Sequence, residues 1–262
     1  MKRLLIIAGS DSGGGAGIQA DIKTADAFNV YTMTAVTAVT AQNTKGVKAI
    51  HEIPPAIVAE QITATLSDIG ADAIKIGMLH SAKIVKAVAA ALKEKSAKNI
   101  PIVLDPVMIA TSGDRLLARK AVAAMLKHLF PLAALVTPNI PEAQVLVNMR
   151  GTKRTDAEAA ARKLMALGAG AALIKGGHAT KSTIDDVLVW KGGVDVYAFP
   201  RIKTKHTHGT GCTLSTAIAC GLADGLSLPL AVSRAREYVQ KAIETAPGLG
   251  KGNGPLNHFP CG

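Results

Sequence analysis

The sequence of 262 residues predicts an α/β fold in three layers, with a mostly parallel central sheet between two layers of helices. The first observation is that short apolar segments alternate repeatedly with segments whose apolar residues recur at helical spacing. The second is that 48% of the residues are hydrophobic but only 3% are aromatic, so the core must consist of Ala, Val, Ile and Leu. That composition is typical of buried parallel strands covered by alanine-rich helices. Since no linker or repeat interrupts the pattern, we expect a single domain over residues 1–262.

The N-terminal half is expected to alternate strand and helix from the start. RLLIIAG (3–9) is an apolar run, and IQADIKTADAF (18–28) follows it with helical spacing. Ser81 is a suitable N-cap for a later helix. In chain order, the further strands are expected over 33–42, 71–79 and 101–108, and the helices over 56–69 and 81–95.

The C-terminal half continues the alternation and ends on two helices. Gly168 ends one helix, and the stretch 183–200 predicts a hairpin that turns at 191–193. In chain order, the strands are expected over 134–139 and 172–177, and the helices over 115–130, 155–168, 211–224 and 229–245.

Polar residues or glycines follow the carboxyl ends of the expected strands. In open parallel sheets, ligands bind beyond these ends, so the rule selects a site before any motif is considered. The residues that it selects are Gly9 to Asp11, Gln42 and Asn43, Gly77 and Met78, Asp105 to Met108, Asn139, and Lys175 to His178.

The segment GSDSGGGAG (9–17) lies between the first strand and the first helix. It lacks the Gly-Lys-Ser/Thr ending of a P-loop. Residues 15–20 satisfy GxGxxA, but the second strand ends without the acidic residue that would bind a ribose hydroxyl. A phosphate-binding loop and a plain flexible turn therefore both remain open, and glycines would also let the backbone approach a flat substrate.

The stretch HGTGCTLSTAIACGLADG (208–225) places two glycines and a cysteine at the start of a helix. The backbone N–H groups of Gly209, Thr210, Gly211 and Cys212 are expected to converge there on an anion. The same positive field is expected to lower the pKa of Cys212, so that a thiolate beside a phosphate pocket could accept a hydroxyl proton. The alternative is a small buried residue in a tight turn.

The spacing of His206, His208 and Cys212 raises the question of a zinc site. A tetrahedral site needs a fourth ligand or an open catalytic position, and no further His/Cys pair has suitable spacing. We therefore disfavour zinc.

Three further residues at strand ends are suited to phosphoryl transfer. Asp105 in LDPVM and Glu142 in TPNIPEA offer carboxylates for Mg²⁺, and Lys175 in LIKGGH offers a point cation. Gln42 offers a donor and an acceptor in one plane, which can read an aminopyrimidine edge. Together with the anion hole and a base, these groups form the set that phosphoryl transfer needs.

The formal charge of +11, from 30 Lys and Arg against 19 Asp and Glu, raises the hypothesis of nucleic-acid binding. The basic residues are scattered and aromatic residues are few, so we expect no nucleic acid as a partner. No apolar run reaches the roughly 18 residues of a membrane span, and no signal peptide is recognisable. The three cysteines, Cys212, Cys220 and Cys261, lack CxxC spacing, which favours a reducing compartment, and we expect a cytoplasmic protein without membrane association.

Seven segments, in order along nearly the whole chain, carry a resemblance to a known family. The sequence resembles the ribokinase-like superfamily and, within it, the hydroxymethylpyrimidine/phosphomethylpyrimidine kinases of thiamine biosynthesis. The segments are AGSDSGGGAGIQADIKT (8–24), VTAQNT (39–44), KIGML (75–79), VLDPVM (103–108), TPNIPEA (137–143), LIKGGH (173–178) and KHTHGTGCTLSTAIA (205–219).

The resemblance implies a three-layer α/β/α fold without a large lid, a homodimer, and ATP with Mg²⁺ as cofactors. It implies phosphorylation of 4-amino-5-hydroxymethyl-2-methylpyrimidine and then of its monophosphate. Cys212 stands where most ribokinase-like sugar kinases have an aspartate base, and Gln42 matches the residue that reads the pyrimidine. Pyridoxal or pyridoxine kinase is the alternative. The other implied positions are Gly9, Ala16, Met78 and Val107 for the substrate, Asn139, Lys175, Lys205 and Thr207 for the nucleotide, and Asp105 with Glu142 for the metal.

Overall fold

The computed structural model describes residues 1–94, 97–108, 116–177 and 182–260. Within these residues, one nine-stranded sheet has the order β3-β2-β1-β4-β5-β6-β7-β8-β9. The six strands from β2 to β7 in this order pair in parallel, whereas β3 at one edge and β8 with β9 at the other are antiparallel. The strands are β1 (Arg3–Asp11), β2 (Tyr31–Asn43), β3 (Gly46–Glu52), β4 (Ala73–Ile76), β5 (Ile102–Leu104), β6 (Leu135–Val136), β7 (Ala172–Ile174), β8 (Thr183–Trp190) and β9 (Gly193–Pro200).

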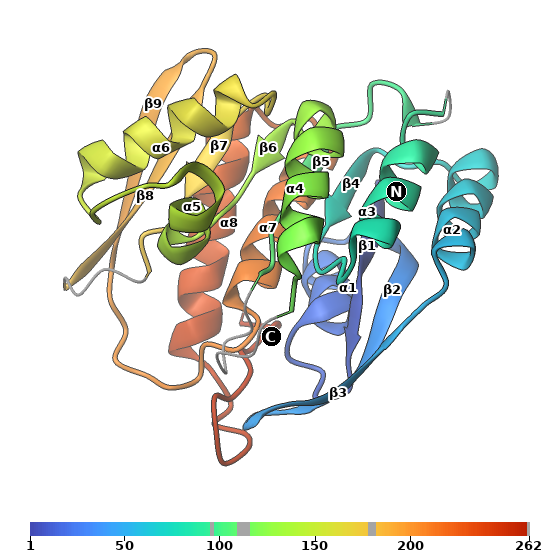
Figure 1. The fold of residues 1–262 in the computed structure, drawn as a ribbon. Helices are drawn as coiled ribbons and strands as arrows, with labels where there is room; N and C mark the ends of the chain where they lie inside the picture. The colour runs from blue at the N-terminus through green and yellow to red at the C-terminus, as the bar shows by residue number, and fades with distance from the viewer. Residues whose placement is uncertain (95–96, 109–115, 178–181, 261–262) are drawn as a thin grey trace.

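Helices cover both faces of the sheet (Figure 1). Helices α2 to α6 pack on one face, and α1, α7 and α8 pack on the other. The expected three-layer α/β/α architecture is therefore confirmed. The helices are α1 (Gly17–Ala27), α2 (Pro55–Asp68), α3 (Ala82–Ala91), α4 (Arg119–His128), α5 (Ile140–Val147), α6 (Arg154–Ala166), α7 (Thr210–Ala223) and α8 (Leu228–Glu244), with a 3₁₀ turn, η2 (Phe130–Leu132).

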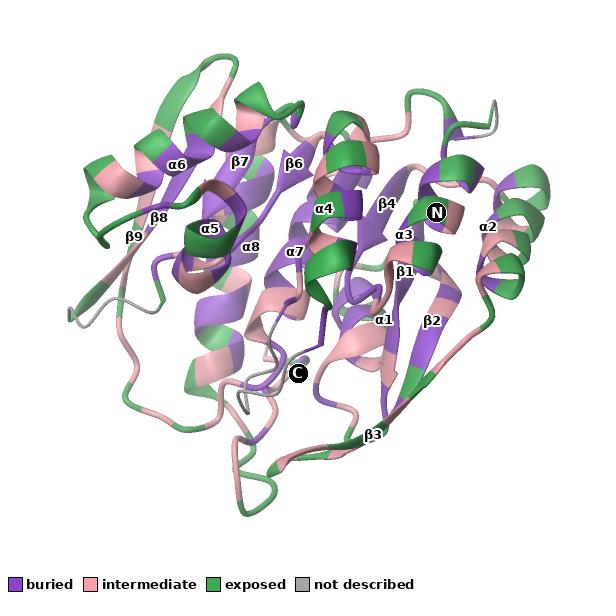
Figure 2. Ribbon diagram, in the orientation of Figure 1, coloured by how far each residue is buried: buried purple, intermediate pink, exposed green. Residues whose placement is uncertain are grey.

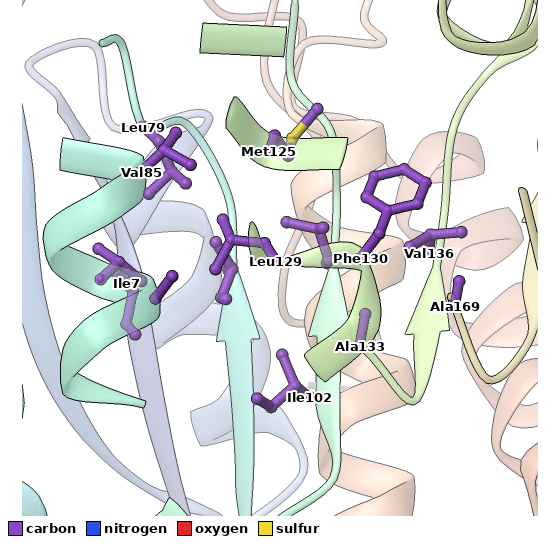
Figure 3. Close-up of a cluster of buried hydrophobic side chains, with 14 of the residues drawn as sticks. Ile7, Leu79, Val85, Ile102, Met125, Leu129, Phe130, Ala133, Val136 and Ala169 are labelled. Atoms are coloured by element: carbon purple, nitrogen blue, oxygen red, sulfur yellow. The ribbon is translucent and has the colours of Figure 1, made fainter. Parts of the chain in front are cut away.

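The alternation of side chains along each strand divides the core into two clusters. In β4, Ile74 and Ile76 pack toward α2 to α6, whereas Ala73 packs toward α7 and α8. Figure 3 shows part of the first cluster, in which Phe130 and Leu129 lie against Val136 and Ile102. Figure 2 shows that the central strands are buried, whereas the residues of β3 are intermediate or exposed. Lys75 is an exception to the apolar character of the central strands, because it is a fully buried lysine on the side of β4 that faces α7.

Most expected elements are present, with bounds that differ by a few residues. Strand β4 covers only four residues of 71–79, and α4 begins at Arg119 instead of residue 115. Ser81 caps α3, as expected, by accepting a hydrogen bond from the N–H of Ile84 at 3.4 Å. Parts of the expected elements and sites at Lys95, Arg115, His178 and Cys261 lie outside the described residues.

Two elements were missed. Helix α5 has only eight residues, and the prolines on either side of Asn139 resemble the end of a strand, although Pro141 lies at a helical position that lacks a hydrogen-bond partner anyway. Strand β3 has the sequence GVKAIHE, in which several side chains are exposed because it is an edge strand. It therefore carries no continuous apolar signal. No helix of the described residues is long and apolar enough to cross a membrane.

Candidate active site

One cavity of about 660 Å³ collects nearly all the expected site residues at the carboxyl ends of the strands. It runs from the β1, β2 and β4 side of the sheet, past the start of α7, to the β8 and α8 side. Lys205 does not line it among the described residues and is exposed instead. The expected residues that line it are Gly9, Ala16, Gln42, Met78, Asp105, Val107, Asn139, Glu142, Lys175, Thr207, Gly209, Thr210, Gly211 and Cys212.

Asp11 organises the glycine-rich loop after β1. Its carboxylate accepts hydrogen bonds from the N–H groups of Gly13 at 2.7 Å and Ala16 at 2.9 Å. It also pairs with Nε2 of His208 at 2.8 Å. Burial opposes its charge, but the bonds to His208 and to the loop amides lower the pKa of Asp11. The loop is therefore held by an ionised aspartate, which the sequence reasoning did not select beyond its place at a strand end.

Gln42 lies near the end of β2 with its amide group facing the cavity. Its Oε1 accepts a hydrogen bond from the hydroxyl of Thr40 at 3.2 Å. Its Nε2 lies 3.4 Å from Nε2 of His208. The backbone N–H of Gln42 donates to the hydroxyl of Ser12 at 2.8 Å. The backbone and the side-chain amide of Gln42 are therefore both held in place. A planar donor–acceptor pair is thus fixed at this end of the cavity.

Helix α7 begins with backbone N–H groups directed at the cavity. Gly209 has a φ of 84°, and a Cβ at this position would coincide with the carbonyl oxygen of Gly15. Only glycine allows the two loops to approach this closely. The N–H of Thr210 donates to Thr207 at 3.3 Å. The N–H groups of Gly209, Gly211 and Cys212 have no protein partner among the described residues, so three of the four amides that the sequence predicts to bind an anion are without a protein acceptor.

Cys212 faces the cavity from the first turn of α7 and is half-buried. Burial raises the pKa of its thiol to about 11, even though Lys75 and the N–H of Gly17 favour the thiolate. The expected lowering of this pKa was therefore wrong in direction. The helix field is outweighed because removing the sulfur from water penalises its charged form. The thiol is protonated at neutral pH in this state of the protein.

Lys175 and Asp105 form an ion pair below the start of α7. Nζ of Lys175 lies 2.8 Å from Oδ1 of Asp105, which also accepts a hydrogen bond from Thr137 at 3.1 Å. Burial opposes the ammonium charge, but Asp105 and Glu142 raise the pKa of Lys175. A Cβ on Gly211 would lie 3.2 Å from both Oδ2 of Asp105 and Nζ of Lys175. The missing side chain therefore leaves space above the pair, open to the three amides.

Asn139 and Glu142 form a capping box at the start of α5. The side chain of Asn139 accepts from the N–H of Glu142, and the carboxylate of Glu142 accepts from the N–H of Asn139, each at 2.9 Å. Burial raises the pKa of Glu142 to about 7, with Lys175 opposing the shift and Asp105 adding to it. Asn139 therefore has a local structural role, and it brings the carboxylate of Glu142 toward the Lys175–Asp105 pair.

The two carboxylates are chemically suited to Mg²⁺. The described residues contain no cluster of three or more His, Cys, Asp or Glu that would enclose a metal ion by itself. Mg²⁺ is usually bound by one or two carboxylates together with water and substrate phosphates. Asp105 and Glu142, with the space that Gly211 leaves above Oδ2 of Asp105, match that pattern.

Comparison with known proteins places this geometry in one family. The family model described as phosphomethylpyrimidine kinase matches residues 11–257. The chain belongs to this kinase family. A hydroxymethylpyrimidine/phosphomethylpyrimidine kinase from Streptomyces coelicolor is 46% identical, over 97% of this chain and 93% of that protein.

Two further relatives define the range of the likeness. The bifunctional thiamine biosynthesis protein ThiED of Geobacter sulfurreducens is 48% identical over 98% of this chain, which spans only 52% of that protein. A Bacillus subtilis pyridoxal kinase, solved in complex with ADP, is 38% identical, with a TM-score of 0.88 over 98% of this chain and 97% of that chain. Nearly the whole chain is thus similar both to a hydroxymethylpyrimidine/phosphomethylpyrimidine kinase and to a pyridoxal kinase.

The far end of the cavity in this kinase was missed by the sequence reasoning. Ile184, Ile202 and Ile243 line it, together with the polar side chains of Arg236 and Gln240. Nε of Arg236 lies 2.9 Å from the carboxylate of Asp186, and its guanidinium stacks on Phe199. A signal was present, because Arg236 and Gln240 lie one turn apart on the otherwise apolar face of α8.

Proposed function

We propose that this kinase transfers a phosphoryl group from ATP to 4-amino-5-hydroxymethyl-2-methylpyrimidine and then to the resulting monophosphate, in thiamine biosynthesis. One observation carries the proposal. A single cavity joins the Gln42 amide, the three amides beside Cys212 and the Lys175–Asp105 pair in a chain of the phosphomethylpyrimidine kinase family. A flat polar substrate, a transferring phosphoryl group and a nucleotide need these three regions in this order.

The substrate end is suited to an aminopyrimidine. The planar amide of Gln42 can accept from an exocyclic amino group while it donates to the adjacent ring nitrogen. Gly9 and Ala16 let the backbone approach the ring, and Met78 with Val107 supplies apolar contact. An unpaired edge here costs roughly 1–3 kcal/mol, which is enough to favour rings with the matching edge.

The centre of the cavity is suited to the migrating phosphoryl group. The N–H groups of Gly209, Gly211 and Cys212 lie at the positive end of α7, where negative charge is stabilised. The ammonium of Lys175 can exchange Asp105 for a phosphate oxygen. Asp105 and Glu142 would hold Mg²⁺ through water, and the ion would neutralise phosphate charge.

Cys212 is the proposed proton acceptor for the alcohol substrate. In the first transfer the alcohol oxygen attacks the γ-phosphorus of ATP, and the bond from that phosphorus to the oxygen of the departing ADP breaks. The O–H bond of the hydroxymethyl group breaks at the same time, and an S–H bond forms on the thiolate of Cys212. In the second transfer the acceptor oxygen is already anionic, so no base is needed. Because burial keeps the resting thiol protonated, Cys212 must first release its proton to water in the cavity, and positive charge close to the sulfur favours the resulting thiolate.

The nucleoside of ATP is proposed to lie at the far end. Ile184, Ile202 and Ile243 can sandwich a base, and Thr207 with Asn139 lies between this end and the anion hole. Lys205, which is exposed, would reach the nucleotide only from the rim.

Three properties of the whole protein belong to the same proposal. The chain acts as one kinase domain, and two copies associate. The support is that β3 is an edge strand and that Val39 of β2, which pairs with His51 of β3, has an exposed apolar side chain. The enzyme is cytoplasmic, where ATP is available and its cysteines remain reduced. Its partners are ATP and the pyrimidine, with neither nucleic acid nor membrane required.

The test is a phosphorylation assay with ATP and Mg²⁺. The purified protein is supplied in turn with the aminopyrimidine alcohol, its monophosphate and pyridoxine, and products are separated by ion exchange and identified by mass. We expect conversion of the first two, with a higher kcat/KM for the aminopyrimidine alcohol than for pyridoxine. A preference for pyridoxine would support the pyridoxal kinase alternative, which the likeness to the Bacillus subtilis enzyme motivates. Conversion of none of the three would refute both.

A further inference from the structure

An ion pair that the proposed mechanism does not use is sealed beneath the active site. Nζ of Lys75, on β4, lies 2.7 Å from the carboxylate of Asp21 on α1, and both side chains are 0% exposed. The other carboxylate oxygen of Asp21 accepts a hydrogen bond from Thr216 on α7 at 2.7 Å. Three elements, β4, α1 and α7, thus each contribute one polar group to this buried cluster.

Stability alone does not explain this pair. Moving two charges out of water costs several kcal/mol per ion, and well-packed apolar residues of similar volume are often at least as stabilising. Most of the buried side chains on this face of the sheet are Ala, Val, Leu and Ile. A lysine at this position therefore suggests a use for its charge.

Helix geometry places the pair next to Cys212. Gly17 and Asp21 lie four residues apart on α1, and Cys212 and Thr216 lie four residues apart on α7, so each pair shares one helix face. The N–H of Gly17 faces the sulfur of Cys212, and one turn further Asp21 bonds Thr216. Lys75 reaches Asp21 from β4 and interacts with Cys212. A Cβ on Gly77 would lie 2.9 Å from Nζ of Lys75, so the glycine leaves space for the ammonium.

The charged groups around Cys212 come from every element packed against it. Lys75 on β4 favours the thiolate, and Asp21 on α1 and Asp105 after β5 oppose it. Lys175, after β7, also interacts with Cys212, but it is paired with Asp105 at the cavity surface. In the proposed function Lys175 is engaged by phosphate, which leaves Lys75 as the ammonium that no ligand can reach.

We propose that Lys75 is a positioning residue that supplies the buried counter-charge of the Cys212 thiolate, and that Asp21 and Thr216 hold its ammonium in place. This role rests on the proposed function, because a thiolate is needed to accept the alcohol proton. Asp21 sets how much of the Lys75 charge acts on the sulfur. The pair thus balances two requirements, a protonated thiol at rest and an available thiolate during transfer.

The test measures the reactivity of Cys212 without any substrate. The full chain is alkylated with iodoacetamide over a range of pH values, and site-resolved peptide mass spectrometry follows Cys212 separately from Cys220 and Cys261. In Asp21→Asn the carboxylate that opposes the thiolate is removed, while Asp105 still favours the ammonium of Lys75. We therefore expect alkylation of Cys212 at pH 7.5 to become about tenfold faster. In Lys75→Met the counter-charge is lost, and we expect alkylation to become about tenfold slower.

The opposite signs separate this role from a structural one. A core that is merely loosened would expose the sulfur in both variants and would accelerate alkylation in both, and that result would overturn the proposal. Ile218→Val, a change without charge in the buried part of α7, is the matched control and should leave the rate unchanged. If Lys75→Met does not fold, Asp21→Asn is compared with the double variant Asp21→Asn, Lys75→Met. Faster alkylation only where Lys75 remains supports the proposal, and equal rates overturn it.

The same measurement separates this inference from the proposed function. Shifts of opposite sign in a protein that phosphorylates none of the three substrates would support the counter-charge and refute the kinase reaction. Normal phosphorylation with unchanged alkylation in both variants would refute only the counter-charge.

Discussion

Two Lys–Asp pairs flank Cys212, and they differ in their access to solvent. Lys75–Asp21 is closed on all sides, with both side chains 0% exposed. Lys175–Asp105 lies at the cavity, with side chains 13% and 3% exposed. The N–O distances are nearly equal, at 2.7 and 2.8 Å. The same chemical pair is therefore fixed in one place and open to exchange in the other.

The difference shows how burial assigns roles to like groups. A sealed ammonium cannot replace its carboxylate by water or phosphate, so its charge acts only through space on groups in the core. An ammonium at a cavity wall can release its carboxylate to a ligand and bind phosphate oxygens instead. Lys75 is thus suited to act on the sulfur, and Lys175 is suited to act on the substrate.

The largest expected effect is the loss of stability in Lys75→Met. The change leaves the carboxylate of Asp21 buried without its cation, which costs about 3–5 kcal/mol of unfolding free energy. Urea denaturation measures it. The double variant Asp21→Asn, Lys75→Met leaves no charge unpaired and should recover most of the loss. A double variant as unstable as the single one would show that packing, and not charge, holds this region together.

Cys212→Ala tests the thiol that lies between the two ion pairs. Loss of a general base lowers a rate by roughly 10²–10⁴, and we expect this loss for phosphorylation of the alcohol. Phosphorylation of the monophosphate should change far less, because its acceptor oxygen carries no proton that must leave. Single-turnover rates with each acceptor measure the two steps separately. Equal losses in both steps would assign the thiol a structural role.

Lys175→Met tests the exchangeable pair. Removal of one charge-stabilising group typically lowers kcat by about 10²–10³. We expect kcat to fall equally for both acceptors, because both reactions transfer a phosphoryl group. The free energy of unfolding should fall less than in Lys75→Met, because Asp105 borders the cavity and keeps its bond to Thr137. The measurements are kcat for both acceptors and a urea titration. A stability loss as large as that of Lys75→Met would mean that the two pairs are equivalent.

The fold could be predicted further than the site. Alternating apolar runs and helical segments identify the layers, because burial on both sides of a parallel sheet leaves a direct record in composition. Short elements such as β3 and α5 have little apolar periodicity in the sequence. Pairing at the edge of the sheet determines β3, and a local capping box determines the start of α5. The glycines before Cys212 predicted the amides at the start of α7 because a helix start has the same geometry in any fold.

Long-range electrostatics could not be predicted from local spacing. The pKa of Cys212 depends on Lys75 and Asp21, which are far apart in the sequence and meet only in the folded chain. Residues Arg236 and Gln240, at the far end of the cavity, belong to a helix near the C-terminus that follows no motif at a strand end. Strand order brings strand ends together, whereas helix α8 reaches the cavity only through packing.

Gln42→Leu serves as a reference outside both ion pairs. The amide contacts Thr40 and His208 but no ammonium group, so its loss should weaken pyrimidine binding by about 1–3 kcal/mol. Binding of ATP should stay near that of the unchanged protein. Isothermal titration calorimetry with each ligand measures the two affinities. An unchanged affinity for the pyrimidine would remove Gln42 from the substrate end.

The smallest expected effect concerns His258. Unlike Lys75 and Lys175, this buried base has no carboxylate partner among the described residues. It lies near Thr213, whose hydroxyl is 3.2 Å from its Nε2, and burial lowers the pKa of His258 to about 4 from 6.5, with Lys23 adding to the shift. Because the folded state binds the proton less well than the unfolded state, His258 contributes no instability above about pH 6.5. It weakens the fold as the pH decreases from 6.5 toward 4.

We therefore expect His258→Gln to lower the acid sensitivity of the fold. Between pH 7 and pH 5, the unchanged protein should lose about 1–2 kcal/mol more unfolding free energy than the variant does. Urea titrations at the two pH values measure the difference. Lys75, by contrast, stays an ammonium at both values because Asp21 raises its pKa against the effect of burial. Parallel losses in His258→Gln would show that this imidazole titrates alike in the folded and unfolded states, and that burial without a carboxylate partner does not suppress its charge.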